Sequence, residues 1–411
     1  MQDNEKKPAL RFKGFTDPWE QRKLKELYFQ LTERNTDLLP YQKTLSVATM
    51  SFKTDGNGAA DTSLANYKRL RTGDIAFEGH TSKEFRYGRF VLNDVGDGIM
   101  SPRFSALRPL HEMPINFWKY YIHYEPIMRK VLVNSTKAGT MMNELVINDF
   151  LQGSILVPSM TEQQAIGRFF KQLDTLITLH QRKYEKLVNI KKSMLDKMFP
   201  KNGASVPEIR FKGFTDPWEQ RKLGDISEIK TGPFGSTLHA DDYVSDGIPI
   251  ITTEHFKTGS LPTDKYGLPQ VSENDFSRLS AYILNAGDIV FSRVGSVDIN
   301  ALITPFQSTW LFSGRVLRVR PQNKNSSQFL HTLLETEDVK NDIRTRAVGQ
   351  TMPSINTEIL KTTPLRLPES TLEQEQLGKY FLNLDTLITL HQRKLEKLQN
   401  IKKSCLEKMF V

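Results

Sequence analysis

Two groups of side chains in this sequence have the chemistry that proteins use to hold and read DNA. Arginine can grip guanine through two hydrogen bonds, and serine and threonine hydroxyls can hold phosphates or base edges. The same residue types also fill ordinary surface turns, so each position taken alone fits either role. The candidates are Lys83, Arg86, Tyr87, Arg89 and Arg103 in the first half of the chain, and Thr231, Phe234, Ser236, Arg293, Ser296 and Arg315 in the second half.

Motifs for catalysis are missing from the sequence. An adenine methyltransferase needs an Asn/Asp-Pro-Pro-aromatic element, and the chain has no Pro-Pro pair. It also has no glycine-rich dinucleotide loop, no phosphate-binding loop, no H-E-x-x-H and no G-x-S-x-G. The tripeptide Glu228-Ile229-Lys230 is similar to part of a nuclease site but has no paired acid upstream. We therefore expect no catalytic residue and no metal site in this chain.

The elements that must position the candidate residues occur twice. The segment from Arg11 to Leu24 returns without change as Arg210 to Leu223, and we call each copy a tag. A longer segment, 173–199, returns in closely similar form as 384–410. An internal duplication of this kind predicts two copies of one structural unit.

Each longer repeat has the pattern of a helix. Apolar residues recur at steps of three and four and form one stripe. A helix of this length needs a partner for its stripe, so we expect the two copies to pack as a coiled-coil-like pair, with His180 and His391 setting the register. The paired lysines Lys191-Lys192 and Lys402-Lys403 are expected to lie on solvated faces. The interface residues predicted for this pair, or for a partner subunit, are Leu173, Ile177, Tyr184, Leu187, Leu384, Ile388, Leu395 and Leu398.

The stretches between the tags and the helices differ from each other and mix short β-rich runs with turn residues, which predicts two α+β lobes. Faint correspondences survive between them. Gly73-Asp74 matches Gly287-Asp288, Arg108-Pro109 matches Arg320-Pro321, and Gly139 with Met142 matches Gly349 with Met352. The expected segments are a tag at 1–24, the first lobe at 25–160, a helix at 161–199, a linker and tag at 200–223, the second lobe at 224–370 and a helix at 371–411.

Charge and cysteine content indicate the kind of partner and the cellular compartment to expect. The 411 residues have a formal net charge of +9, which favours an acidic partner such as nucleic acid. The first lobe is +2 and the second is −3, so most of the basic excess lies on the repeated segments. The single cysteine, Cys405, fits a reducing cytoplasm, and neither a membrane span nor a secretory signal is expected.

The whole pattern resembles the specificity subunit of type I restriction-modification enzymes. The resemblance rests on Arg-Phe-x-Gly-Phe-x-x-x-Trp leading to Lys-Leu, a lobe containing Gly-Asp-Ile, and Glu-Gln-Gln-Ala-Ile-Gly or Glu-Gln-Glu-Gln-Leu-Gly opening a long helix, all of it twice. It implies that the lobes are target recognition domains, each reading one part of a split DNA site. It further implies that the helices pair antiparallel and fix the gap between the two half-sites. The first lobe opens with Lys25-Glu26 rather than the Gly224-Asp225 of the second and departs from the family pattern there.

The resemblance also implies partners and cofactors. Two methylation subunits would bind the repeated regions and bring S-adenosylmethionine for adenine-N6 methylation. Restriction subunits would add cleavage driven by ATP with Mg. This chain itself would bind no cofactor and no membrane. The alternatives are a coiled-coil scaffold with two protein-binding lobes and a self-sufficient methyltransferase or nuclease.

Overall fold

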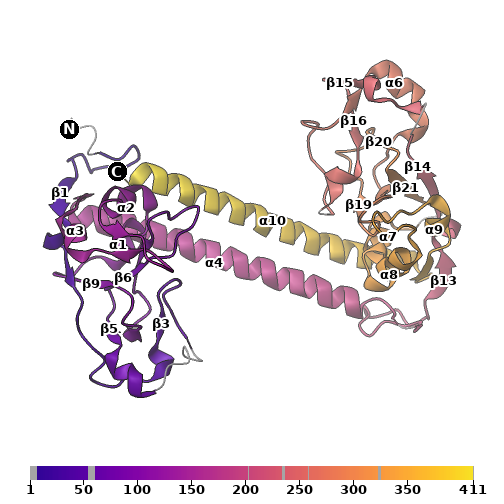
Figure 1. Cartoon of the computed structure of the whole chain (residues 1–411). Coiled ribbons are helices and arrows are strands. Elements are labelled where there is room, and N and C mark those ends of the chain that lie inside the picture. The colour runs from indigo at the N-terminus through magenta and orange to yellow at the C-terminus, as the bar shows by residue number, and fades with distance from the viewer. Residues whose placement is uncertain are drawn as a thin grey trace. The chain divides into compact units, whose positions relative to one another are not determined.

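The computed structural model describes residues 7–53, 61–201, 203–233, 237–257, 259–322 and 325–410. Contacts divide the chain into two compact units (Figure 1). The first unit comprises Met1–Gln181 together with Arg393–Val411, and the second comprises Arg182–Gln392. Each unit combines helices with mainly antiparallel sheets, which confirms the predicted α+β class.

The first lobe is built on a four-stranded antiparallel sheet in the order β2-β9-β6-β7. Its strands are β2 (Tyr28–Gln30), β9 (Ala106–Pro109), β6 (Ile75–Glu78) and β7 (Arg89–Leu92). Smaller antiparallel pairs are β1 (Glu20–Lys23) with β12 (Ser154–Val157), β3 (Leu45–Ser46) with β4 (Ser51–Phe52), β5 (Lys68–Leu70) with β8 (Gly98–Met100), and β10 (Thr136–Lys137) with β11 (Glu144–Leu145). The helices of this lobe are α1 (Ile115–Tyr121), α2 (Glu125–Leu132) and α3 (Ile147–Gln152).

The second lobe repeats this central sheet in the order β14-β21-β18-β19. Its strands are β14 (Ser227–Thr231), β21 (Val316–Pro321), β18 (Ile289–Ser292) and β19 (Asn300–Leu302). A second sheet joins β15 (Tyr243–Val244), β17 (Gln270–Val271), β16 (Ile248–Ile251) and β20 (Leu311–Phe312), and β13 (Glu219–Lys222) pairs with β22 (Pro364–Leu367). The helices are α5 (Leu223–Ile226), α6 (Glu273–Arg278), α7 (Ser327–Leu334), α8 (Glu337–Arg346) and α9 (Thr357–Lys361).

The strand registers show which residues of the two lobes correspond. Ile75 lies opposite Leu107 in the first sheet, and Ile289 lies opposite Val319 in the second. The two Gly-Asp-Ile segments therefore lead into the same strand of the same sheet, although the sequences around them have diverged.

Two long helices, α4 (Met160–Lys197) and α10 (Thr371–Met409), each begin in one unit and end in the other. In the first unit, Asp174 of α4 pairs with Lys402 of α10 at 2.7 Å, and Phe170 contacts Phe410 farther along. Because the higher-numbered α10 residue meets the lower-numbered α4 residue, the helices run antiparallel there. The second unit has the same arrangement, with Lys191 pairing with Asp385 at 2.7 Å, which confirms the predicted antiparallel pair in each unit.

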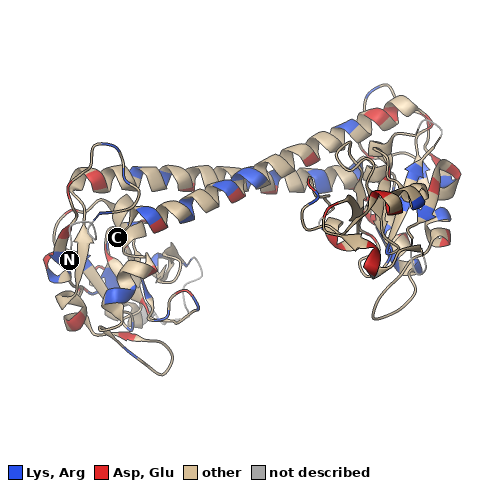
Figure 2. Cartoon of the chain, turned by 90° about the horizontal axis from the view of Figure 1, so that it is seen from above, with Lys and Arg blue, Asp and Glu red and all other residues tan. Residues whose placement is uncertain are grey.

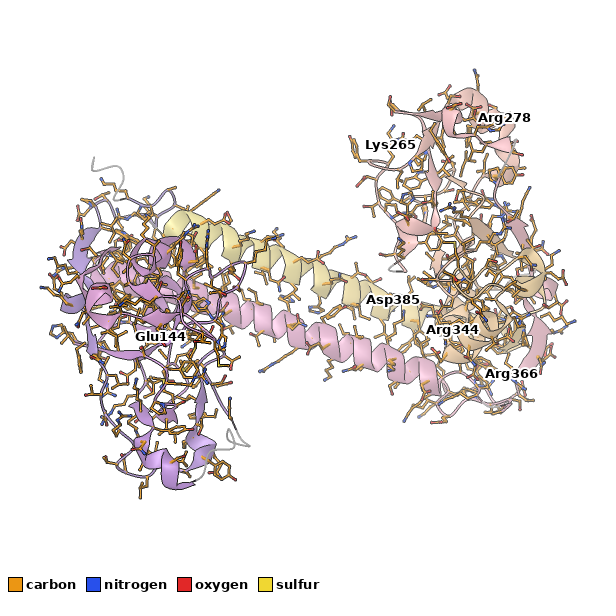
Figure 3. The ribbon with its side chains drawn as sticks, in the orientation of Figure 1. Glu144, Lys265, Arg278, Arg344, Arg366 and Asp385 are labelled. Atoms are coloured by element: carbon orange, nitrogen blue, oxygen red, sulfur yellow. The ribbon has the colours of Figure 1, made fainter. Side chains whose placement is uncertain are left out.

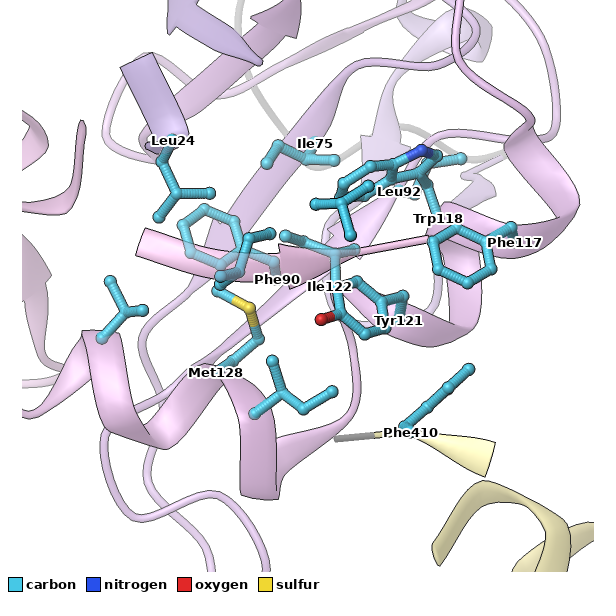
Figure 4. Close-up of a cluster of buried hydrophobic side chains, with 14 of the residues drawn as sticks. Leu24, Ile75, Phe90, Leu92, Phe117, Trp118, Tyr121, Ile122, Met128 and Phe410 are labelled. Atoms are coloured by element: carbon cyan, nitrogen blue, oxygen red, sulfur yellow. The ribbon is translucent and has the colours of Figure 1, made fainter. Parts of the chain in front are cut away.

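The core of the first unit is completed by the end of α10 (Figure 4). The ring of Phe410 lies 5.2 Å from that of Tyr121, 5.7 Å from Phe170 and 6.0 Å from Phe117, measured between centroids. Trp19 of the tag packs edge-on against Tyr121 in the same cluster. The first lobe is therefore closed by an aromatic residue from the second copy of the repeat.

The core of the second unit is completed in the reciprocal way. Phe199, which follows α4, lies 5.7 Å from Trp218, 5.7 Å from Phe381 and 6.0 Å from Phe329. Phe199 and Phe410 are the same position of the repeat. Each copy thus gives the end of its helix to the lobe of the other.

The tags connect these exchanged helix ends to the lobes. Arg11 donates two hydrogen bonds, of 2.7 and 2.8 Å, to the buried carboxylate of Glu162 at the start of α4. The neighbouring Leu10 N–H donates to the carbonyl of Lys408 near the end of α10. The second tag makes the equivalent bonds from Arg210 to Glu373 and from Ile209 to Lys197.

The expectation of solvated lysines was wrong for one lysine of each pair. The Lys191 side chain is only 18% exposed and lies 2.7 Å from both Glu335 and Asp385. Burial lowers the pKa of Lys191, but these two carboxylates outweigh burial and raise it overall. Lys402 lies over the Tyr120 ring in addition to pairing with Asp174, whereas Lys192 and Lys403 are exposed as expected.

The exchange predicts a selective effect of Phe410→Ala. Removing a buried phenylalanine costs about 3 kcal/mol, so the first unit should lose stability while the second keeps its own. Hydrogen exchange followed by mass spectrometry should show faster exchange in α1 and α3. The control is Ile401→Ala, at an exposed position of the same helix. Equal protection of α1 in wild type and Phe410→Ala would contradict the assignment of Phe410 to this core.

Candidate nucleic-acid interface

In the second lobe, three of the predicted contact residues meet at one end of the central sheet. Strand β14 ends at Thr231, β18 ends just before Arg293, and β21 begins just after Arg315. The Arg293 N–H donates to the Arg315 carbonyl at 2.9 Å, and Arg293 Nη1 donates to the Gly314 carbonyl at 3.1 Å. Ser296 is exposed in the following turn.

The first lobe places an arginine at the corresponding position. Leu107 and Val319 are equivalent by strand register, so Arg103, four residues before Leu107, corresponds to Arg315. Both arginines are exposed. Among the described residues neither takes part in an ion pair, which leaves both guanidinium groups available to an anion.

Lys83, Arg86 and Tyr87 lie on the connection between β6 and β7. Lys83 and Arg86 are exposed, and Tyr87 is half-buried against the lobe core. The Arg86 guanidinium lies 6.0 Å from the Tyr87 ring centroid, and that of Arg103 lies 5.4 Å from Phe104. An arginine held over a ring keeps its edge free for hydrogen bonds, which suits contact with DNA.

Arg89 is tied into the lobe. Its guanidinium lies 5.0 Å from the Phe85 ring, Nη2 donates to the Ala48 carbonyl at 3.1 Å, and Nε lies 3.4 Å from Glu78. These contacts make it a weaker candidate than Arg86 for holding DNA. Phe234 and Ser236 lie outside the described residues.

Each central sheet contains a buried aspartate paired with an arginine, a feature that we did not predict. Arg108 donates to Asp74 at 2.9 and 2.8 Å, and Arg320 donates to Asp288 at 2.7 and 2.8 Å. Burial raises the pKa of Asp74 despite these bonds, and bonding to Asp288 raises the pKa of Arg320. The signal was present in the sequence, because the matched Gly-Asp and Arg-Pro dipeptides supply the two partners.

Several other cations of the second lobe are paired internally. Arg278 pairs with Asp242 and Asp275, and Lys265 pairs with Asp246 (Figure 3). Basic and acidic residues are interspersed over both lobes (Figure 2). Ion pairing thus takes up part of the positive charge of the second lobe, and Arg315 at the sheet end is one of the exposed cations without an ion pair among the described residues.

The predicted helix-interface residues face inward. Leu173, Leu384 and Leu395 are buried. Leu398 packs against the core that contains Leu173, and Leu187 packs against the core that contains Leu384. The other three, Ile177, Tyr184 and Ile388, are half-buried.

A second helix face, which we did not predict, is apolar and exposed. Leu176 and Leu179 of α4 are 43% and 45% exposed, and their repeat equivalents Leu387 and Leu390 of α10 are 43% and 44% exposed. We call these four residues the leucine strip. The two leucines of each helix are three residues apart and so lie on the same face of that helix.

Two features are not found in the described part of the chain. No group of three or more histidine, cysteine, aspartate or glutamate side chains there could hold a metal ion. None of its helices is long and apolar enough to span a membrane.

Comparison with known proteins gave consistent results. The family described as Type I restriction modification DNA specificity domain matches residues 17–189 and again residues 215–400. The type I restriction enzyme MjaVIII specificity subunit of Methanocaldococcus jannaschii is 23% identical over 292 residues, which cover 69% of this chain and 67% of that protein. The putative MjaX specificity subunit of the same organism is 23% identical over 358 residues, covering 83% and 78%.

A solved structure shares the fold. The crystal structure of the S subunit of a type I restriction-modification system from M. genitalium aligns with a TM-score of 0.63 at 16% identity, over 98% of this chain and 99% of that one.

Substitutions of the buried arginine and of the exposed arginine of the second sheet should differ in their effect on stability. Arg320→Met leaves the 2%-exposed Asp288 without its partner and should lower the free energy of unfolding of the second unit by about 2 kcal/mol. The matched Arg315→Met should change it by less than about 0.5 kcal/mol. Hydrogen exchange in β18 and β21 under increasing urea measures both effects, and equal destabilisation by the two variants would disprove the distinction.

Proposed function

The chain belongs to the family of type I restriction-modification DNA specificity proteins, and we propose that each of its lobes reads one half of a bipartite DNA site. The observation that carries the proposal is the recurrence of an exposed arginine at the same end of the same sheet in both lobes. Arg103 precedes β9 and Arg315 precedes β21. Two similar lobes in one chain can diverge separately, so the two half-sites need not be palindromic.

In this proposal the chain supplies recognition and partner subunits supply the chemistry. Methylation subunits bring S-adenosylmethionine and transfer a methyl group to adenine N6. Restriction subunits add ATP-driven cleavage with Mg. We assign the two leucine pairs of the leucine strip, one pair in each unit, to the methylation subunits, because the pair recurs in both copies and lies outside the inward-facing helix stripe.

The residues that we propose to contact DNA differ in exposure and in the group that they offer. Arg103, Arg315, Arg86 and Lys83 are exposed cations, and Ser296 is an exposed hydroxyl. Thr231, Tyr87 and Arg293 border these groups and are half-buried. Lysine and arginine contacts to phosphate would fix the position of each lobe, and arginine contacts to guanine would select sequence.

A protein-binding scaffold is the competing function. It accounts for the helices and the leucine strip, but gives no reason why both lobes keep an exposed arginine at an equivalent position. Lobes that have diverged while their tags stay identical favour DNA recognition, in which the target sequence changes and the tags and helices stay constant.

The direct test is to produce the chain with a type I methylation subunit in cells that lack adenine methylation and to map N6-methyladenine. We expect methylation at a single split motif. Arg103→Ala should weaken methylation through one half of the motif and Arg315→Ala through the other, each by roughly tenfold, as for the loss of a bidentate base contact. An assembled complex that methylates no split motif would overturn the proposal, and the matched Lys192→Ala should leave the pattern unchanged.

The helix pair predicts the spacing of the motif. Deleting 178–184 from α4 together with the equivalent 389–395 from α10 shortens both helices by about 10 Å, or about three base pairs of DNA. The deletions lie between the two Lys–Asp pairs and retain both of them. The methylated motif should then have a shorter gap with unchanged half-sites. Deleting 178–184 alone is the control and should impair assembly. Full activity of the double deletion at the original spacing would contradict the idea that the helix pair sets the gap between the half-sites.

A further inference from the structure

Each lobe carries a short loop that exposes one methionine. In the first lobe the loop lies between β10 and β11, and Met141 is 77% exposed. In the second lobe Val348 and Ser354 pair through both of their backbone N–H groups and enclose a loop in which Met352 is 67% exposed. Few large apolar side chains of the described residues are so open to water.

The two loops are tethered at the same place. The Asn143 N–H donates to the carbonyl of Gly79, the residue after β6. The Ile355 N–H donates to the carbonyl of Arg293, the residue after β18, and the Gly295 N–H donates to Pro353. Since β6 and β18 are equivalent strands, both loops lie beside the sheet end that holds the arginines.

A glycine in each loop allows the backbone to approach itself closely. A Cβ on Gly139 would meet the carbonyl oxygen of Met142 at 2.3 Å, and one on Gly349 would meet that of Met352 at 2.9 Å. Gly349 also has φ +101°, which side-chain-bearing residues rarely adopt. A glycine followed three residues later by a methionine is retained in lobes that otherwise share little sequence, although the exposed Met141 lies one position before the half-buried Met142, which is the equivalent of Met352.

The surroundings of the loops favour DNA as their occupant. In the first lobe the Asn143 side chain donates to the Arg86 carbonyl, and in the second the loop is bonded to Arg293, whose neighbour is Arg315. Glu144 is the acidic group next to the first loop (Figure 3) and would repel phosphate, which directs this loop at bases rather than at the backbone. An exposed apolar side chain with cations beside it, such as Met141 or Met352 with the equally exposed Val348, has the form of a wedge that enters between base pairs.

We infer that Met141 and Met352 are apolar wedges that insert into the DNA of their respective half-sites and unstack base pairs there. This inference rests on the proposed DNA-reading function. Unstacking would lower the work of extruding the adenine that a methylation subunit must reach, because extrusion requires the base to leave the stack. Methionine suits this role because its side chain is flexible and polarizable.

The experiment uses the full complex with methylation subunits and a duplex of the mapped split motif, with 2-aminopurine placed in one half-site at a time. We expect Met141→Ala to reduce DNA affinity about tenfold, or about 1.4 kcal/mol. It should also abolish the rise in 2-aminopurine fluorescence in one half-site only. Met352→Ala should act in the same way on the other half-site. Met141→Leu and Met352→Leu, which keep an apolar wedge, should restore both signals.

The controls are Leu110→Ala and Val206→Ala, which remove exposed apolar side chains elsewhere. Unchanged affinity and fluorescence in both alanine variants would overturn the wedge while leaving the recognition function intact. Weaker binding of the methylation subunit, measured without DNA, would overturn it in favour of protein docking. A wild-type complex that binds no split motif would overturn both proposals.

Discussion

The structure depends on the exchange of helix ends between the two copies of the repeat. Each lobe has an aromatic cluster around the tag tryptophan, Trp19 or Trp218, with one position that its own copy does not fill. Phe410 fills it in the first unit and Phe199 in the second. Neither copy can therefore complete its core from its own sequence. The missing ring matters because burial of an aromatic side chain is among the largest favourable contributions to the stability of a small core. The tag bonds, from Arg11 to Glu162 and from Arg210 to Glu373, hold the start of each helix against the same core.

This exchange of helix ends constrains the tags and helices to stay constant and leaves the lobes free to vary. The tags, the helix starts and the exchanged phenylalanines contact one another, so a change in one of them affects the others. The lobes retain the central sheet, the buried Asp–Arg pair, the exposed arginine at the sheet end and the glycine-bent methionine loops. A buried pair with two hydrogen bonds fixes the strands rigidly. The other residues at the sheet end are then free to differ between lobes without disturbing the tags and the helices.

The sequence predicted the helices well because their signal is local. Apolar residues at steps of three and four identify a helix and its inward face, and Leu173 and Leu384 are indeed buried. The same periodicity cannot tell which lobe the end of a helix will complete, so the exchange of Phe199 and Phe410 was not foreseen. Lys191 was misjudged for a related reason, because its partner Glu335 is 144 residues away.

The candidate site could be predicted only in part. Residue type suggested Arg103 and Arg315, but their equivalence required strand register, which appears only once non-local pairing is known. Arg89 had the right chemistry, yet its contacts with Phe85, Ala48 and Glu78 come from three separate segments. The assignments to DNA contact remain predictions. Gly139 with Met142 and Gly349 with Met352 were visible as a faint match, whereas the exposure of the loops was not.

The composition of the two units also sets the order in which they can fold during synthesis. The second unit is one continuous stretch, Arg182–Gln392, whereas the first needs residues near 410 to close the core that begins at Trp19. At about 5–20 residues per second, the ribosome needs roughly ten to forty seconds to pass from the first part of that unit to the last. During this time the second unit can fold, while Phe117, Tyr121 and Phe170 of the first wait without their partner. The lobe made first is therefore finished last, and it is the part of the nascent chain that most needs protection from aggregation.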